Sequence, residues 1–198
     1  MKKLLLLIGA SLLFTACGGA GTSKSAFAVK IDGKDVPLEV KSSWEMTKDF
    51  TDYSDPKKPT TALYWFALRN YAYDKPNGTI IFDNEKLTAP GQVLVFISLY
   101  GDKATTNEKT PVKVADYKGD GKYSTSLSTV TVYLFGAGKD EVYSVDLGGG
   151  SPNNKGEVKI NSVTGDTVTG EIDASGKANG KDVSVKGTFT AKIYKPGQ

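Results

Sequence analysis

Apolar and polar residues alternate along most of the chain beyond residue 26. In residues 27–31 and 36–40 every second position is apolar, and Asp32-Gly33 separates the two runs. Two alternating runs joined by Asp-Gly predict a β-hairpin. Residues 183–194 alternate without interruption, which predicts a long strand with one buried face. Shorter strands of the same kind are expected at residues 129–134 and 157–160.

Two segments near the C-terminus share the pattern Val-x-Gly-x-apolar-x-Ala. They are residues 168–174 and 185–191, and the turn-rich segment 175–180 separates them. The simplest interpretation is that the two segments are the partner strands of one antiparallel hairpin. A glycine inside each strand then marks a bulge or a close approach of another backbone segment.

The middle of the chain is rich in aromatic residues, with 11 of the 20 between positions 44 and 100. Residues 62–68 and 93–99 are apolar at successive positions, which suits central strands that are covered on both faces. A helix over residues 61–73 is the alternative, because several apolar positions there also share a helical face. The aromatic content favours a strand.

Length and composition fit one globular domain. The chain has 198 residues, of which 39% are hydrophobic and 24% charged, as in ordinary globular proteins. Together with the alternating pattern, this predicts an all-β fold. We expect an antiparallel β-sandwich or flattened barrel of about ten strands over residues 26–198.

The chain contains no His and only one Cys. The composition therefore excludes His-based triads, His metal sites, intramolecular disulfides and thiolate zinc clusters. We predict no enzymatic activity, no cofactor and no metal. A hydrolase that uses only carboxylates is the enzyme-class alternative, with the pairs Asp52/Asp55 and Asp83/Glu85 as examples, but solvated loop charge is the preferred interpretation of these acids.

Two further motifs have a weak chemical signal. Residues 116–121 resemble the start of a calcium loop, but Lys118 stands at loop position 3, where a ligand is needed, and Leu127 at position 12, where a bidentate Glu is needed. We expect an ordinary Gly-rich turn there. Ser54 and Lys57 have the Ser-x-x-Lys spacing of some acyl-enzymes, but Pro56 opposes the helix that this chemistry requires.

The first 16 residues have the features of an export signal. Lys2 and Lys3 precede the apolar run 4–13, which is too short to span a bilayer. The sequence Phe14-Thr15-Ala16-Cys17 resembles the lipobox of bacterial lipoproteins, with Phe14 where that pattern prefers Leu. The resemblance implies cleavage before Cys17, lipid on its thiol and anchoring in a membrane.

Residues 17–25 contain the lipidated Cys17 and a small, polar tether. Position 18 is Gly and not Asp, which by resemblance to the sorting rule of enteric bacteria implies the outer membrane. Removal of Lys2 and Lys3 lowers the formal net charge from +3 to +1. A nearly neutral chain whose only Arg is Arg69 argues against a nucleic-acid partner.

The layout of the body also resembles a group of known proteins. Its motifs are the F-x-V-x-I-D-G-K hairpin at 27–34, Gly121-Lys122-Tyr123, and the C-terminal series G-x-V-x-I, G-D-T-V-T-G-x-I and G-K-D-V-x-V-x-G-x-F within 156–189. This resembles the small β-rich lipoproteins of Gram-negative bacteria such as Bacteroidetes and spirochaetes. The resemblance implies fold and compartment, and supplies no catalytic residues.

The aromatic segment supplies the candidate binding residues. Trp and Tyr offer large, rigid contact area at binding surfaces, whereas in a sandwich most such rings form the core. Trp65, Arg69, Tyr71 and Tyr73 are the candidates for a surface patch, and Tyr71 and Tyr73 are favoured among them because Arg69 and Asn70 beside them are polar. The functional hypothesis is a non-catalytic interaction or structural module that binds protein or glycan. The alternative is a carrier of a small apolar ligand in a barrel interior.

Overall fold

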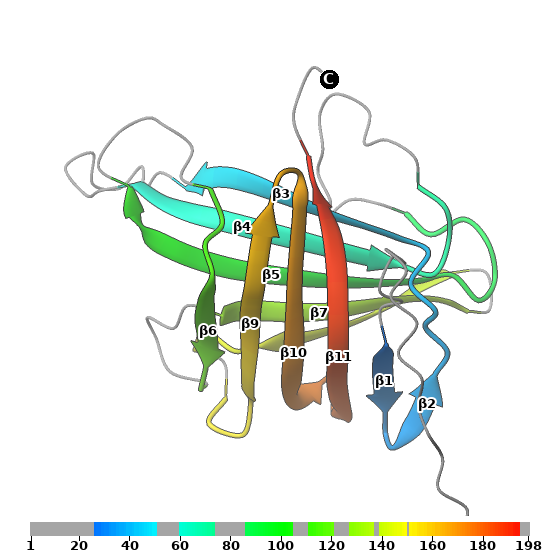
Figure 1. Ribbon diagram of the computed structural model, residues 1–198. Helices are drawn as coiled ribbons and strands as arrows, with labels where there is room; N and C mark the ends of the chain where they lie inside the picture. The colour runs from blue at the N-terminus through cyan, green and yellow to red at the C-terminus, as the bar shows by residue number, and fades with distance from the viewer. Residues whose placement is uncertain are drawn as a thin grey trace, which may run out of the picture.

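The computed structural model describes residues 26–50, 60–73, 86–104, 111–120, 127–136, 139–149 and 151–194. These residues form eleven strands (Figure 1), and they include no helix that could span a membrane. The all-β prediction is confirmed. The strands are β1 Phe27–Ile31, β2 Lys34–Val36, β3 Ser42–Phe50, β4 Thr60–Arg69, β5 Val93–Ala104, β6 Ala115–Gly119, β7 Leu127–Gly136, β8 Lys139–Asp146, β9 Lys155–Thr164, β10 Thr167–Ala178 and β11 Lys181–Ile193.

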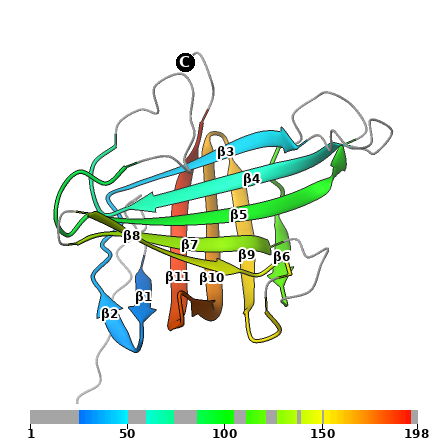
Figure 2. The same cartoon turned by 180° about the vertical axis from the view of Figure 1, so that it is seen from behind.

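The strands lie in two layers that cross steeply, as the two opposite views show (Figures 1 and 2). The first sheet has the order β3-β4-β5-β7-β8, and the second has the order β6-β9-β10-β11, with β1 beside β11 and β2 beside β1. All pairings within each sheet are antiparallel. Since the strand path ends at β6 and β8 without joining them, the fold is an open sandwich and not a closed barrel.

A short parallel ladder joins the two sheets at one corner. Lys192 and Ile193 of β11 pair with residues 44 and 45 of β3. The Ser43 hydroxyl donates to the Thr190 carbonyl, and the Tyr194 amide donates to the Glu45 carbonyl at 2.8 Å. The corner thus fixes how the first sheet sits on the second.

The main core fills the space between the sheets. Phe66 of β4 and Phe189 of β11 meet edge to face across the layers, with ring centroids 5.2 Å apart. Tyr64 and Tyr117 make a similar contact at 6.2 Å. The fully buried side chains include Leu68, Ile97, Leu99, Leu127, Leu147 and Ile160.

The N-terminal hairpin forms at the predicted place. Asp32 and Gly33 have φ angles of 49° and 72°, the left-handed pair that a two-residue hairpin turn requires. The second strand covers residues 34–36 and shares only Val36 with the predicted run 36–40, so the prediction is wrong for residues 37–40. Pro37 follows, and it has no N–H for a ladder.

The C-terminal hairpin joins the two segments that share one pattern. The pairing is antiparallel, so Gly170 lies opposite Phe189 and Gly187 lies opposite Ile172. Each glycine therefore faces the large residue of the other segment. The register of β9 against β10 shifts at Gly170. At Gly187 a Cβ would meet the backbone of Ala26 and Phe27, so both expected consequences of a strand glycine occur.

The segment 61–73 is a strand only in part. β4 ends at Arg69. Beyond it, the side chain of Asn70 makes hydrogen bonds in place of the strand pairing. Its Oδ1 accepts from the Val93 amide at 2.8 Å and its Nδ2 donates to the Gly91 carbonyl at 2.9 Å. The helix alternative is wrong for residues 61–69, because β4 pairs with β3 and β5 over its length and its successive apolar side chains are covered on both faces.

The expected Gly-rich turn at residues 116–121 is wrong for its described part, since residues 115–119 form β6. Tyr117 and Gly119 face inward while their neighbours are exposed. A Cβ at Gly119 would lie 2.6 Å from Leu147 Cβ, so glycine serves close packing there. Asp116 and Lys118 are exposed residues of this strand, so the segment does not form the loop that a calcium site requires.

Candidate interaction surface

The outer face of the first sheet carries a second apolar cluster. Ala67, Leu87, Leu94 and Phe96 form its buried floor. Around them lie side chains that are only partly buried and that come from three different segments. We call this surface the aromatic face, and its partly exposed members are Trp65, Tyr71, Tyr133 and Phe135.

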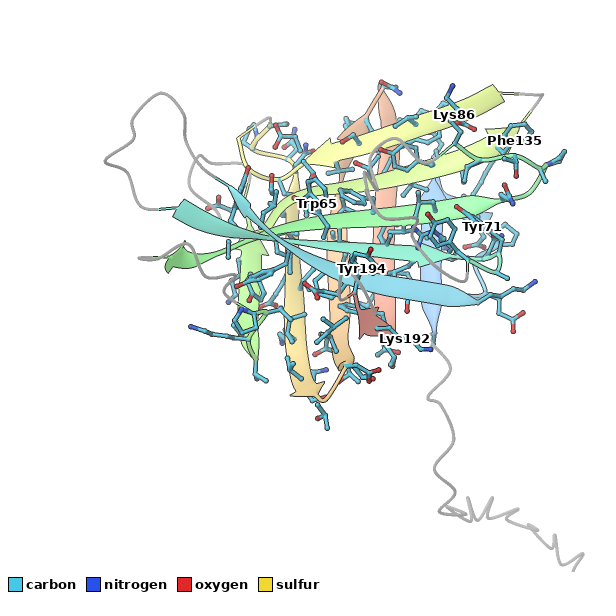
Figure 3. The ribbon with its side chains drawn as sticks, turned by 90° about the horizontal axis from the view of Figure 1, so that it is seen from above. Trp65, Tyr71, Lys86, Phe135, Lys192 and Tyr194 are labelled. Carbon is cyan, nitrogen blue, oxygen red and sulfur yellow. The ribbon has the colours of Figure 1, made fainter. Side chains whose placement is uncertain are left out.

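Strand alternation brings these residues to one face. Odd positions of β4 and β7 and even positions of β5 point away from the main core. Cross-strand pairing sets Ala67 opposite Phe96, and Leu94 opposite both residue 69 and Tyr133. Trp65 lies edge to face with Phe96, with ring centroids 5.6 Å apart. Figure 3 shows Trp65, Tyr71 and Phe135 spread across the surface.

Residues 86–92 cover part of the aromatic face. Leu87 inserts into the cluster and is only 4% exposed. The Gln92 side chain holds this segment in shape, since its Oε1 accepts from the amides of Thr88 and Ala89 at 2.7 and 3.1 Å. Lys86, at the start of the segment, is exposed. The β4–β5 half of the face is therefore more covered than the β7–β8 half, where Val142 is 41% exposed.

The candidate residue Arg69 is fully buried. Its guanidinium lies 4.2 Å from the centre of the Tyr73 ring, within the range of a cation–π interaction. Its Nη1 also donates to the Ala67 carbonyl at 3.4 Å. Arg69 is therefore a buried residue that contacts Tyr73 and is not itself part of an exposed surface. The other three candidates, Trp65, Tyr71 and Tyr73, are half-buried.

The structure thus brings together some of the predicted residues and adds others. Arg69 contacts Tyr73, and Trp65 and Tyr71 pack against the same cluster. Sequence reasoning missed Tyr133 and Phe135 because they lie about 60 residues further along the chain, and only the strand order places β7 next to β5. The sequence did contain one signal for them. Tyr133 and Phe135 alternate with the buried Val130 and Val132 along β7, so they lie on the other face of the sheet.

A carboxylate lies at the margin of the aromatic face. Asp140 of β8 pairs with Phe135 of β7, so the two side chains are neighbours on the same face. The Asp140 Oδ1 atom is buried, and none of the described residues donates a hydrogen bond to it. A buried oxygen of this kind is costly unless a donor reaches it.

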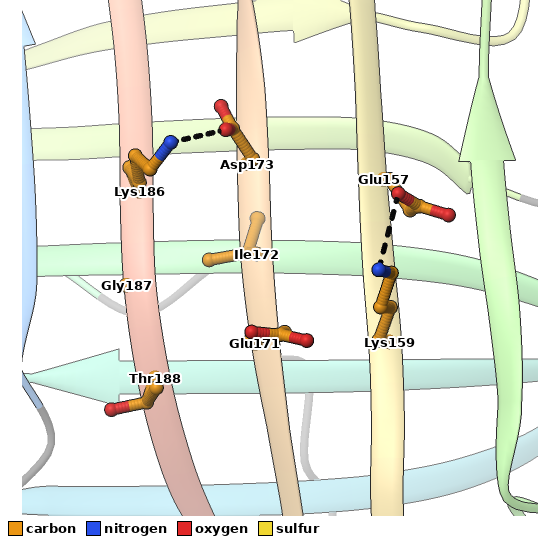
Figure 4. A pocket seen from close by; sticks show the side chains of 8 residues that line it. All are labelled: Glu157, Lys159, Glu171, Ile172, Asp173, Lys186, Gly187 and Thr188. Atoms are coloured by element: carbon orange, nitrogen blue, oxygen red, sulfur yellow. Dashed lines mark hydrogen bonds and ion pairs between the residues drawn. The ribbon is translucent and has the colours of Figure 1, made fainter.

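The outer face of the second sheet is charged instead of aromatic. Lys118 lies 3.3 Å from Glu157 and Lys186 lies 2.6 Å from Asp173, each pair across neighbouring strands. Glu157, Asp173 and Lys186 are among the residues that line a shallow depression of about 350 Å³ (Figure 4). The hydrogen bond and charge of Asp173 raise the pKa of Lys186. The charges compensate one another, as expected for a solvated sheet face.

A second depression, of about 460 Å³, lies at the end of the same sheet near Lys30 and Gly33. Lys177 and Asp182 pair across it at 2.6 Å, and the Asp182 carboxylate raises the pKa of Lys177. Both depressions are shallow and charged, and the space between the sheets is packed with side chains. A carrier of an apolar ligand requires an enclosed apolar cavity instead.

The remaining sequence candidates can be placed only in part. Cys17, Ser54, Lys57 and the acid pairs at 52/55 and 83/85 lie outside the described residues. Among the residues that are described, no three acidic, Cys or His side chains converge to hold a metal ion. No protein-family model, curated protein or solved structure matches this chain.

Proposed function

We propose that this chain is a lipid-anchored outer-membrane lipoprotein whose β-sandwich binds a partner protein or glycan without catalysing a reaction. The observation that carries the proposal is the contrast between the two outer faces of the sandwich. One face presents compensated charges, and the other presents partly exposed aromatic rings over a buried apolar floor.

The aromatic face has the composition of a binding surface. Trp and Tyr are enriched at interaction sites because they bury large apolar area with little loss of conformational entropy. Half-buried rings held by their neighbours are also pre-organised, which lowers the entropy cost of binding. Trp65 is fixed by Phe96, and Tyr73 is fixed by Arg69.

Asp140 adds a polar requirement to the partner. Asp140 is partly exposed beside Phe135, so a partner that presents a hydroxyl or an N–H to its carboxylate would add a hydrogen bond. Sugars combine apolar C–H faces with hydroxyl groups, and protein surfaces combine apolar side chains with N–H groups. Both classes therefore fit, and the experiment below separates them.

The test uses quantitative crosslinking and pull-down from intact cells. The variant Tyr71→Ser/Tyr133→Ser removes two partly exposed rings and spares the buried Arg69. We expect recovery of the partner to fall by at least tenfold, since central aromatic anchors contribute about 2 kcal/mol or more each. Protease treatment of the envelope before capture then separates the classes, because only a glycan partner survives it.

The matched control changes the other face. Glu171→Ser/Thr188→Ser alters two exposed residues on the second sheet, and we expect it to capture partners like the wild type. Thermal unfolding of each variant shows whether it is folded. If a folded aromatic-face variant captured the same partners at the same level, the binding part of the proposal would be rejected.

The anchor is tested separately through Cys17. Residues 17–25 span at most about 30 Å when extended, so the domain would remain close to the lipid. We expect Cys17→Ser to abolish incorporation of radiolabelled fatty acid and to move the protein from the detergent phase to the aqueous phase. Persistent lipid labelling of that variant would contradict the anchor and leave the binding experiment unaffected.

A further inference from the structure

β8 is the longest strand edge that the described residues leave unpaired. Within the part of the chain that the structure describes, three strands have a single partner: β2 with three residues, β6 with five and β8 with eight. An unpaired edge can add a strand from another chain, and very short edge strands are one natural protection. That protection applies to β2 and β6, but β8 is long enough to pair.

The backbone of β8 alternates between its partner and the open edge. The Leu147 amide, just beyond β8, donates to the carbonyl of Ser128 in β7 at 2.7 Å. In an antiparallel pair the backbone groups of alternate residues point to the same side. Odd-numbered residues of β8 therefore face β7, and even-numbered residues, Val142 and Asp146 among them, direct their carbonyl groups outward.

Two asparagine side chains bind these outward carbonyl groups. Asn179 Nδ2 donates to the Val142 carbonyl at 2.8 Å, and Asn154 Nδ2 donates to the Asp146 carbonyl at 2.8 Å. The two acceptors are four residues apart, so the caps lie at separate places along the edge. A strand that paired with β8 here would have to displace both amide groups.

Asn154 is held firmly in this position. It is 3% exposed, and its Oδ1 accepts from the Lys177 amide of β10 at 2.9 Å. A Cβ at Gly176 would lie 2.6 Å from Asn154 Cγ, so the missing side chain at Gly176 makes room for it. One side-chain amide thus joins the edge of the first sheet to β10 of the second.

Asn179 has two roles in one residue. It has a φ of 52° and, with Gly180 at 76°, forms the turn between β10 and β11. Asn is one of the few residues that tolerate this conformation. Its side chain then reaches across to β8, so the hairpin turn also covers the strand edge. Figure 2 shows β8 beside β7 at the margin of the first sheet.

We infer that Asn154 and Asn179 keep the chain monomeric by capping the edge of β8 against β8 of a second copy. Identical strands can pair antiparallel about a two-fold axis, which makes a second copy the natural partner for an open edge. The caps block this pairing and leave the aromatic face, which adjoins β8 through Val142 and Asp140, open to other partners.

The test compares the oligomeric state of two proteins. One is the full chain with Cys17→Ser, and the other carries Asn179→Gly in addition to Cys17→Ser. Glycine keeps the left-handed turn and removes the cap. We expect sedimentation equilibrium to show a self-association constant raised about tenfold for each cap removed. Amide hydrogen exchange at Val142 and Ser144 should slow as the protein concentration rises.

Two further variants complete the test. Asn153→Gly changes an exposed neighbour in the Asn154 loop, and we expect it to remain monomeric. Val142→Pro removes an outward N–H, so added to Asn179→Gly it should restore the monomer. The inference is overturned if folded Asn179→Gly stays monomeric at high concentration, or if it associates without protection of β8 or despite Val142→Pro.

Discussion

Gly170 of β10 lies opposite Phe189 of β11, and the Phe189 ring occupies the space that a side chain at position 170 would need. A Cβ on Gly170 would lie 2.7 Å from Phe189 Cζ and 2.6 Å from the Lys159 carbonyl oxygen. The same ring meets Phe66 of the opposite sheet. One absent side chain therefore permits the aromatic contact that joins the two layers.

Gly170→Ala should destabilise the fold by about 1–3 kcal/mol, because the added methyl collides with both a core ring and a backbone oxygen. Urea unfolding of the two proteins measures the difference. Gly136→Ala is the control, since a Cβ there has no atom within 4 Å, and it should stay within about 0.5 kcal/mol of the wild type. Equal effects of the two changes would contradict the close approach.

Removing the Tyr73 ring should weaken the fold through Arg69. Tyr73→Leu deletes the ring that lies 4.2 Å from the buried guanidinium, whereas Tyr73→Phe retains it. We expect the free energy of unfolding of Tyr73→Leu to be about 1–2 kcal/mol below that of Tyr73→Phe. If the two variants were equally stable in urea, the ring–guanidinium contact would have no energetic role.

Stability should fall at alkaline pH as the paired lysines lose their protons. Asp173 and Asp182 raise the pKa of Lys186 and of Lys177 above the ordinary value of 10.5. A lysine whose pKa is higher in the folded than in the unfolded state stabilises the folded protein. This stabilisation is complete below pH 10.5 and disappears as the pH rises through the folded-state pKa. Asp173→Asn/Asp182→Asn removes it at every pH.

The stability difference between wild type and this double variant is thus expected to be present at neutral pH and to vanish above pH 10.5. Urea unfolding over that range measures the difference. High salt should reduce it at neutral pH as well, because both pairs are exposed and screened. A difference that grew with pH would show that the sign of the linkage is wrong.

Gly176→Ala should displace Asn154 from its site between β8 and β10. Its Cβ would lie 2.5 Å from Val145 Cγ1 and close to the Asn154 side chain, so we expect a loss of about 1–3 kcal/mol. In an Asn154→Ala background the same change should cost much less, because part of the collision is removed. Additive effects in this double-mutant cycle would contradict the shared space.

The sequence allowed the fold class and two of the hairpins to be predicted, since alternation and turn residues are local signals. Asp32-Gly33 and the shared pattern at 168–174 and 185–191 each identified a hairpin that the structure contains. The strand at residues 62–68 was also predicted, because a continuous apolar run is typical of a strand that is covered on both faces. β4 is such a strand, since its residues contribute to the apolar clusters on both of its faces.

Properties that depend on strand order could not be predicted. The aromatic face combines β4, β5 and β7, and no local pattern states that Tyr133 lies beside Leu94. Arg69 was expected to belong to a surface patch, yet tertiary packing under Tyr73 buries it fully. β6 was expected to be a turn, because its Asp and Gly residues are local turn signals that pairing with β9 overrides.

The central place of β11 has a consequence for the order in which the protein acquires its structure. β11 is the last described strand, and it pairs with β10, with β1 and with β3. Phe27 pairs with Gly187, 160 positions later in the sequence. Such distant pairings raise the contact order and slow folding. A chain that emerges N-terminus first can form the β3-β4-β5-β7-β8 meander early, but β1 waits unpaired on one side until β11 arrives. A chain that lacks β11 would thus leave the edge of β1, the edge of β10 and the paired part of β3 open at once, and open edges of this kind favour aggregation.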